Sequence, residues 1–268
     1  MHVHFLDPYR SGNSLVHRLD PRIKFILTLG FILVASLTPV GAWPVYILLF
    51  SIILSVEVLS ELGVRYVLKR SMLAFLFVLA ALPVIFTTAD RIILTFSLGT
   101  WTFTITQAGL ERFISIFLKS WISIQAAIVL ASSTPFPELM MAMRAIRIPR
   151  LLVAIFGLMW RYLFVLADEA LRLMRARLAR SGHSDQVGLK PGGSVWWRAG
   201  VTGRMAGSLF LRAFERSDRI YMAMISRGYD REVRAAPLPK LRGVDSLIIV
   251  GGLLLLVFLL LFAILFWA

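Results

Sequence analysis

The chain has 268 residues, of which 58% are hydrophobic and 16% are charged, and its mean hydropathy is +0.79. This is more hydrocarbon than the core of a soluble domain of that length needs, and it predicts a polytopic membrane protein. The chain has no cysteine, which excludes disulfides, thiolate metal ligands and cysteine nucleophiles. The formal net charge is +14, and 19 of the 29 Lys and Arg residues lie between Ser132 and Gly243.

Five apolar runs are long enough to be membrane spans, since a hydrocarbon core of about 30 Å needs about 20 helical residues, or somewhat fewer when flanking groups snorkel. The first run follows Asp20-Pro21, a capping carboxylate before a proline at the first helical position. The five predicted spans are Ile23–Thr38, Trp43–Leu59, Ser71–Thr88, Phe113–Ala131 and Val244–Trp267.

The distribution of basic residues predicts the orientation of these spans. Basic residues cluster before the first span, between the second and third, and between the fourth and fifth, whereas the loop Pro39–Ala42 has no charge. Cytoplasmic loops carry the excess of Lys and Arg. We therefore expect a multi-pass protein of the cell (inner) membrane with a cytoplasmic N-terminus and an external C-terminus.

A short hairpin is predicted on the external side, between the third and fourth spans. Apolar and polar residues alternate over Ile92–Thr106 about the turn Leu98-Gly99-Thr100. A period of two residues is typical of a half-buried strand.

A sixth apolar run, Leu151–Ala167, leaves an alternative open. It carries Arg161, and a charge at the middle of the bilayer costs about 2.5 to 3.5 kcal/mol on insertion scales. We therefore interpret this run as part of a long interfacial helix that becomes basic at Asp168–Gly182. The competing interpretation is an extra membrane span.

These observations predict an all-α polytopic membrane protein with about five transmembrane helices and cytoplasmic amphipathic coupling helices. Its expected parts are an N-terminal membrane bundle of four spans over residues 1–131, a cytoplasmic coupling-helix domain over 132–243, and a C-terminal transmembrane helix over 244–268. The coupling helices are expected at about Pro135–Ile146, Pro149–Arg180 and Arg198–Arg227.

The basic segment contains an internal repeat. A shift of 47 residues aligns a set of positions that includes Asp168 with Glu215, Arg172 with Arg219, and Arg180 with Arg227. Each copy places an acidic residue four positions before an arginine, the favourable orientation for an ion pair within a helix, and each stops at a glycine. We therefore predict helix ion pairs Asp168–Arg172 and Glu215–Arg219, and helix ends at Gly182 and Gly228.

Each copy closes on an arginine between two small residues, namely Ala179-Arg180-Ser181 and Ser226-Arg227-Gly228. Small neighbours let a partner surface approach the guanidinium closely, so the six residues form a candidate docking site. The alternative is that each arginine only neutralises the last carbonyls of its own helix. Duplication of the whole pattern favours docking.

Two further segments complete a family resemblance that covers essentially the whole chain. With the two tripeptides, Leu19-Asp20-Pro21-Arg22-Ile23-Lys24 and the run from Met205 to Arg212 resemble the transmembrane coupling (T) component of energy-coupling-factor transporters, in particular its cobalt-type branch CbiQ. The signature of that family is two Ala-Arg-Gly tripeptides on cytoplasmic coupling helices. Neither tripeptide here has that sequence, but both departures substitute another small residue.

The resemblance implies a function and a set of partners. Arg180 and Arg227 would each dock into a groove of one of two ATP-binding subunits. The chain would transmit their ATP-driven motion to a substrate-binding membrane subunit, most simply for cobalt uptake, and a small accessory membrane subunit is a further candidate partner. Nickel and vitamin systems with the same type of subunit stay open, because substrate recognition belongs to another chain.

Enzymatic functions are less well supported by the residues. No G-x-x-x-x-G-K-[ST] motif occurs, so we expect no ATP binding by this chain itself and no cofactor. No HExxH motif or His and carboxylate cluster predicts a metal or catalytic site. A membrane-embedded lipid-modifying enzyme remains the rival from another class. The amphipathic basic helices favour protein partners with anionic lipid contact over nucleic acid.

Overall fold

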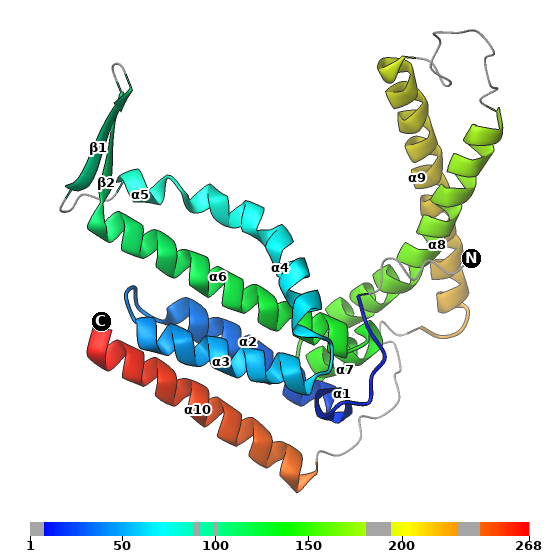
Figure 1. The fold of residues 1–268 in the computed structure, drawn as a ribbon. Helices are drawn as coiled ribbons and strands as arrows, with labels where there is room; N and C mark the ends of the chain where they lie inside the picture. Colours follow the sequence, from blue (N-terminus) through cyan, green and yellow to red (C-terminus); the bar gives the residue numbers. More distant parts are fainter. Residues whose placement is uncertain (1–7, 88–91, 99–100, 181–193, 230–241, 268) are drawn as a thin grey trace. The chain divides into compact units, whose positions relative to one another are not determined.

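The structure is a computed structural model that describes residues 8–87, 92–98, 101–180, 194–229 and 242–267 (Figure 1). The chain divides into two compact units. One holds the membrane bundle with α1 to α7, the hairpin and α10, and the other holds the long helices α8 and α9. The sequence had grouped α7 with the coupling helices.

The membrane bundle contains every predicted span. Its helices are α1 (Leu15–Arg18), α2 (Pro21–Leu37), α3 (Trp43–Leu59), α4 (Val64–Val78), η2 (Leu79–Ala81), α5 (Val84–Thr87), α6 (Gln107–Ser133), α7 (Phe136–Ala145) and α10 (Gly243–Trp267). The second unit contains α8 (Arg150–Arg180) and α9 (Val195–Ile225). The protein is thus an all-α membrane protein, apart from one hairpin among the described residues.

The first span begins as its sequence predicts. Asp20 caps α2, because its carboxylate accepts a hydrogen bond from the backbone N–H of Arg22 at 2.9 Å, and Pro21 is the first helical residue. At the other end of α2, the ammonium of Lys119 from α6 donates hydrogen bonds to the carbonyls of Ser36 and Thr38. A cation at a helix C-terminus satisfies orphan carbonyls and complements the dipole, which explains a lysine inside a span.

Contacts at the two ends of the bundle define the directions of three spans. Lys24 near the start of α2 donates to the carbonyl of Ser133 at the end of α6. At the opposite end, Gly41 lies beside Glu111 near the start of α6 and Trp267 at the end of α10. Helices α2 and α10 therefore run one way and α6 the other, which is the alternation that the charge distribution predicts.

The third predicted span is not one continuous helix. Helix α4 begins at Val64, before the predicted Ser71, and ends at Val78, after which a 3₁₀ turn and the short helix α5 follow. Pro83 lies between these pieces. Proline has no N–H to donate and disfavours helical geometry at the preceding residue, so the apolar run bends where hydropathy alone predicts a straight span.

The predicted hairpin is confirmed, whereas its external side stays a prediction. Strands β1 (Ile92–Leu98) and β2 (Trp101–Thr106) pair antiparallel, with Leu98 opposite Trp101 and an irregularity between Ile92 and Leu94. Thr106 then caps α6, because its hydroxyl accepts a hydrogen bond from the N–H of Gly109 at 3.2 Å.

The core of the bundle lies where α2, α3, α4, α6 and α10 meet, and it includes Phe31, Leu49, Val67, Ile122 and Leu256. Two glycines bring α2 and α10 close together. A Cβ on Gly252 would lie 2.6 Å from Cδ2 of Leu27, and one on Gly30 would lie 3.2 Å from Cδ2 of Leu253. Small residues at a crossing are how membrane helices gain close packing.

Three helices, α6, α8 and α10, are long and apolar enough to cross a membrane, judged by length and composition. Helix α3 is apolar over 17 residues. The inclusion of α8 keeps open the alternative that Leu151–Ala167 is a span.

Candidate functional site

Helices α8 and α9 form an antiparallel pair of two 31-residue helices. Arg177 near the end of α8 donates a hydrogen bond at 3.0 Å to the hydroxyl of Thr202 near the start of α9. Glu169, earlier in α8, contacts Arg212 and Arg216, later in α9. The contacts pair later residues of α8 with earlier residues of α9, so the helices are antiparallel. Their C-terminal ends therefore point in opposite directions.

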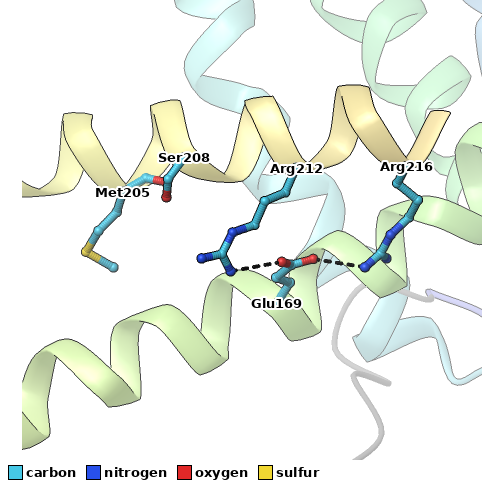
Figure 2. Close-up of polar contacts among 5 residues, drawn as sticks. All are labelled: Glu169, Met205, Ser208, Arg212 and Arg216. Atoms are coloured by element: carbon cyan, nitrogen blue, oxygen red, sulfur yellow. Dashed lines mark hydrogen bonds and ion pairs between the residues drawn. The ribbon is translucent and has the colours of Figure 1, made fainter. Parts of the chain in front are cut away.

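A single carboxylate joins the two helices, as Figure 2 shows. Oε1 of Glu169 lies 3.4 Å from Nη1 of Arg212, and Oε2 lies 3.3 Å from Nη2 of Arg216. The Glu169 side chain is 19% exposed, against 57% for Arg212 and 35% for Arg216. Arg212 and Arg216 are one helical turn apart and therefore reach the same acceptor. We call this three-residue contact the clasp.

The rest of the contact face of α9 is only partly polar. Met205 and Ser208 lie on the same side of α9 as the two arginines of the clasp (Figure 2). Both are half-buried, and the Ser208 hydroxyl donates to the carbonyl of Met205 at 2.9 Å, so it is satisfied within its own helix. The clasp and the Arg177–Thr202 hydrogen bond are therefore the polar contacts between the two helices, beside side chains that pack.

The clasp lies at equivalent positions of the internal repeat. The shift of 47 residues that aligns Arg180 with Arg227 also aligns Glu169 with Arg216. Eleven residues separate Glu169 from Arg180, and eleven separate Arg216 from Arg227. At 1.5 Å per residue, each candidate docking arginine ends an arm of about 16 Å that starts at the clasp. The pair is a two-armed element with one arginine at each tip.

The tip at Arg227 has a well-defined backbone. The N–H of Gly228 donates to the carbonyl of Ile225 at 2.9 Å, and the N–H of Tyr229 donates to the carbonyl of Met224 at 3.0 Å. With Gly228 at φ 75°, these bonds form a Schellman motif. The predicted helix end at Gly228 is confirmed, and a Cβ on Gly228 would meet no atom within 4 Å, so a partner can approach there.

Both candidate arginines are exposed. Arg180 is the last residue of α8, with Ala179 exposed before it, and Ser226, Arg227 and Gly228 are all exposed after α9. No carboxylate in the described part of the chain pairs with Arg180 or Arg227. Ser181 and the predicted helix end at Gly182 lie outside the described residues.

The predicted ion pairs within each helix do not form in the structure. Within the ranges that the structure describes, Asp168 does not pair with Arg172, and Glu215 does not pair with Arg219. An exposed pair four residues apart is worth only about 0.3 to 0.5 kcal/mol, which barely offsets the side-chain entropy that it costs. The neighbouring Glu169 instead makes the contact between helices.

Sequence reasoning missed Glu169 as a site residue. The available signal was its alignment with Arg216 under the 47-residue shift, because equivalent positions of two antiparallel copies meet where the copies cross. Opposite charges at such positions indicate a crossing point.

Large apolar side chains remain uncovered on this unit. Helix α9 exposes six of them along its second half: Phe210, Leu211, Phe214, Tyr221, Met222 and Ile225. Helix α8 exposes others, among them Leu151, Ile155, Met159, Leu171 and Met174. Contiguous exposed apolar surface of this kind marks sites of protein or membrane contact.

No group of three or more metal-ligating side chains occurs among the residues that the structure describes. What the α8–α9 unit presents is an arginine at each tip, other exposed arginines along its helices and apolar surface, which is an arrangement suited to binding macromolecules.

The fold identifies the chain as a polytopic membrane protein whose second unit is an exposed helix pair. Residues 12–237 match the model of the CbiQ family, described as cobalt transport protein. The chain belongs to this family.

Named relatives resemble most of the chain. The energy-coupling factor transporter transmembrane protein EcfT of Lactococcus lactis subsp. cremoris is 27% identical over 95% of this chain and 96% of its own length. The cobalt transport protein CbiQ of Rhodobacter capsulatus is 26% identical over 79% of both chains. A putative fused cobalt transport protein, CbiMQ of Methanocorpusculum labreanum, is 24% identical over 85% of this chain and 37% of its own length.

Proposed function

We propose that this chain is the transmembrane coupling component of an energy-coupling factor importer. It transmits ATP-driven motion of two nucleotide-binding subunits to a substrate-binding membrane subunit, and its cargo is cobalt. The observation that carries the proposal is the two-armed α8–α9 unit with an exposed arginine at each tip, equally far from the clasp.

The geometry supports two docking sites rather than one. An arginine fork can bond a carboxylate or backbone carbonyls of a partner through two donors, and such contacts are the strong ones when water is excluded. Because the two arms extend in opposite directions from the clasp, one small partner does not reach both tips. Two copies of a partner, or two similar partners, do.

A coupling element must also transmit displacement. A long helix moves as a rigid rod, and the clasp and the Arg177–Thr202 hydrogen bond hold two such rods against each other. A change in the distance between the two docked subunits would therefore change the angle between α8 and α9, and this is the motion that we propose to reach the membrane.

The names of the relatives support both the assignment and the cargo. Two of them are called cobalt transport proteins, and a third is called an energy-coupling factor transporter protein. Nickel or vitamin uptake by the same type of subunit is the alternative cargo. A membrane-embedded lipid-modifying enzyme is disfavoured, because the described residues offer exposed cations but no group of three or more His, Asp or Glu side chains.

The test is reconstitution of the chain with its ATP-binding and substrate-binding subunits in proteoliposomes. We expect ATP-dependent uptake of radioactive cobalt, and its loss in the Arg180→Ala/Arg227→Ala double variant with the spans still inserted. The chain alone should not hydrolyse ATP. Uptake of nickel in preference to cobalt would change the cargo, and turnover of lipid by the isolated chain would overturn the assignment.

A further inference from the structure

The membrane bundle contains a cavity of about 310 Å³ that the coupling function does not use. It lies among α1, α2, α3, α6 and α10, all of which belong to one unit. Its walls are aliphatic, with Leu15, Leu27, Val56 and Leu256 among them. An apolar cavity of this size between membrane helices has the chemistry to hold a hydrocarbon chain.

The polar groups of the cavity lie at one end of the bundle. Lys24 and Ser133 line the wall there, and the Lys24 ammonium donates to the Ser133 carbonyl at 3.2 Å. Lys24 is 7% exposed. An ammonium has three donors, so two remain without an acceptor among the described residues. The Ser133 hydroxyl, 2% exposed as a residue, is also without a partner in the described part of the chain.

The charge at this end of the cavity is positive. Arg18 is exposed at the end of α1, between Leu15 and Leu19, which both line the cavity, and Arg22 follows on α2. The opposing carboxylates are Asp20, 3.8 Å from Arg22, and Glu138, which together with Asp20 acts on the charge of Lys24. Among these five groups the cations outnumber the carboxylates by three to two. In the proposed orientation this end lies at the cytoplasmic membrane surface.

We infer that the cavity binds one acyl chain of an anionic membrane lipid. The hydrocarbon fills the space between the helices, and the headgroup phosphate takes the free donors of Lys24 and Ser133, with Arg18 at the surface. Charge complementarity selects the occupant, since an unpaired buried cation is costly and an anionic oxygen satisfies it. The bound lipid would fill the bundle beside α10. This inference does not depend on the docking role of Arg180 and Arg227.

The experiment is native mass spectrometry of the full-length chain in detergent, with phosphatidylglycerol and phosphatidylcholine of identical acyl chains as probes. The wild-type chain should retain phosphatidylglycerol with a preference of roughly tenfold, as one or two charge-assisted hydrogen bonds provide. Lys24→Met should remove the preference. Lys119→Met is the matched control, because Lys119 is also a membrane lysine bonded to carbonyls but does not line the cavity.

Two further variants, each with a matched control, test the inference if Lys24→Met does not fold. Arg18→Gln should reduce the preference, whereas Arg65→Gln, an exposed arginine of α4 away from the cavity, should not. Val56→Phe fills the cavity and should abolish binding of both lipids, whereas Val58→Phe, at an exposed position of the same helix, should leave it intact.

Three results would overturn the inference. Equal retention of the two lipids by the wild-type chain would show an apolar site without headgroup recognition. Undiminished phosphatidylglycerol binding in Val56→Phe would place the lipid elsewhere. Loss of the lipid when the whole complex assembles would show that a partner side chain occupies the cavity.

Discussion

The membrane bundle and the α8–α9 unit differ in how far their side chains are buried and paired within the protein. In the bundle, Lys24 and Lys119 are placed against backbone carbonyls at helix ends, and glycines allow helices to pack at van der Waals distance. In the α8–α9 unit, no residue of α9 is buried and only Ala154 is buried on α8.

This difference indicates which part of the molecule is complete on its own. A bundle with a packed core needs only lipid around it. A helix pair that exposes aromatic and aliphatic residues beside unpaired arginines leaves both unsatisfied until another surface covers them. The proposed division of labour follows: the bundle anchors, and the helix pair couples.

The largest expected effect is a difference in cysteine labelling between a loop of the membrane bundle and the α8–α9 unit, which we expect on opposite sides of the membrane. Single cysteines can be placed at Val40 and Ala199, both exposed, in this cysteine-free chain. An impermeant thiol reagent added outside should label Val40→Cys fully and Ala199→Cys not at all. Gly41 is unsuitable, because φ is +85° and a Cβ there would lie 2.5 Å from Oε1 of Glu111. External labelling of Ala199→Cys would establish α8 as an extra span.

The next effect tests the claim that the bundle is tightly packed. Gly252→Leu should destabilise the bundle by about 1 to 3 kcal/mol, the usual cost of overpacking, because its Cβ would meet Leu27 at 2.6 Å. Gly251→Leu is the control, since nothing lies within 4 Å of a Cβ there. Thermal unfolding in detergent measures both. Equal midpoints for the two variants would mean that α2 and α10 are not in close contact.

The smallest effect concerns the clasp. Glu169→Gln should weaken the α8–α9 contact by about 1 kcal/mol or less, as expected for a partly exposed ion pair. Hydrogen exchange of the α9 backbone around Arg212 and Arg216 should accelerate accordingly. Glu215→Gln, which removes an exposed carboxylate without an ion pair in the described residues, should leave exchange unchanged. The same acceleration in both variants would argue for a general charge effect.

Sequence patterns were most informative where one residue type dictates local geometry. Asp20-Pro21 predicted the start of α2, the alternating run predicted the hairpin, and Gly228 predicted the end of α9. Hydropathy predicted the third span as a continuous helix, which was wrong, because mean hydropathy does not register the missing N–H of Pro83.

Contacts between residues far apart in the chain could not be predicted from the sequence. Lys119 lies within the fourth predicted span, and its acceptors lie 81 and 83 residues away along the chain. Glu57 lies within the second predicted span and is 1% exposed, a burial that hydropathy does not predict. The clasp joins residues 43 and 47 positions apart, so only the internal repeat pointed to it. The docking role of Arg180 and Arg227 stays a prediction, because its partners are other chains.

The most direct test counts ATP-binding subunits in the intact complex by native mass spectrometry. The account predicts two per wild-type chain, one in Arg180→Ala, one in Arg227→Ala and none in the double variant, since each lost fork costs about 2 kcal/mol, or roughly thirtyfold in affinity. Lysine should rescue poorly at either tip, because it has no planar fork. Two subunits retained by the double variant, or equal losses from Arg175→Ala and Arg204→Ala, would contradict the account.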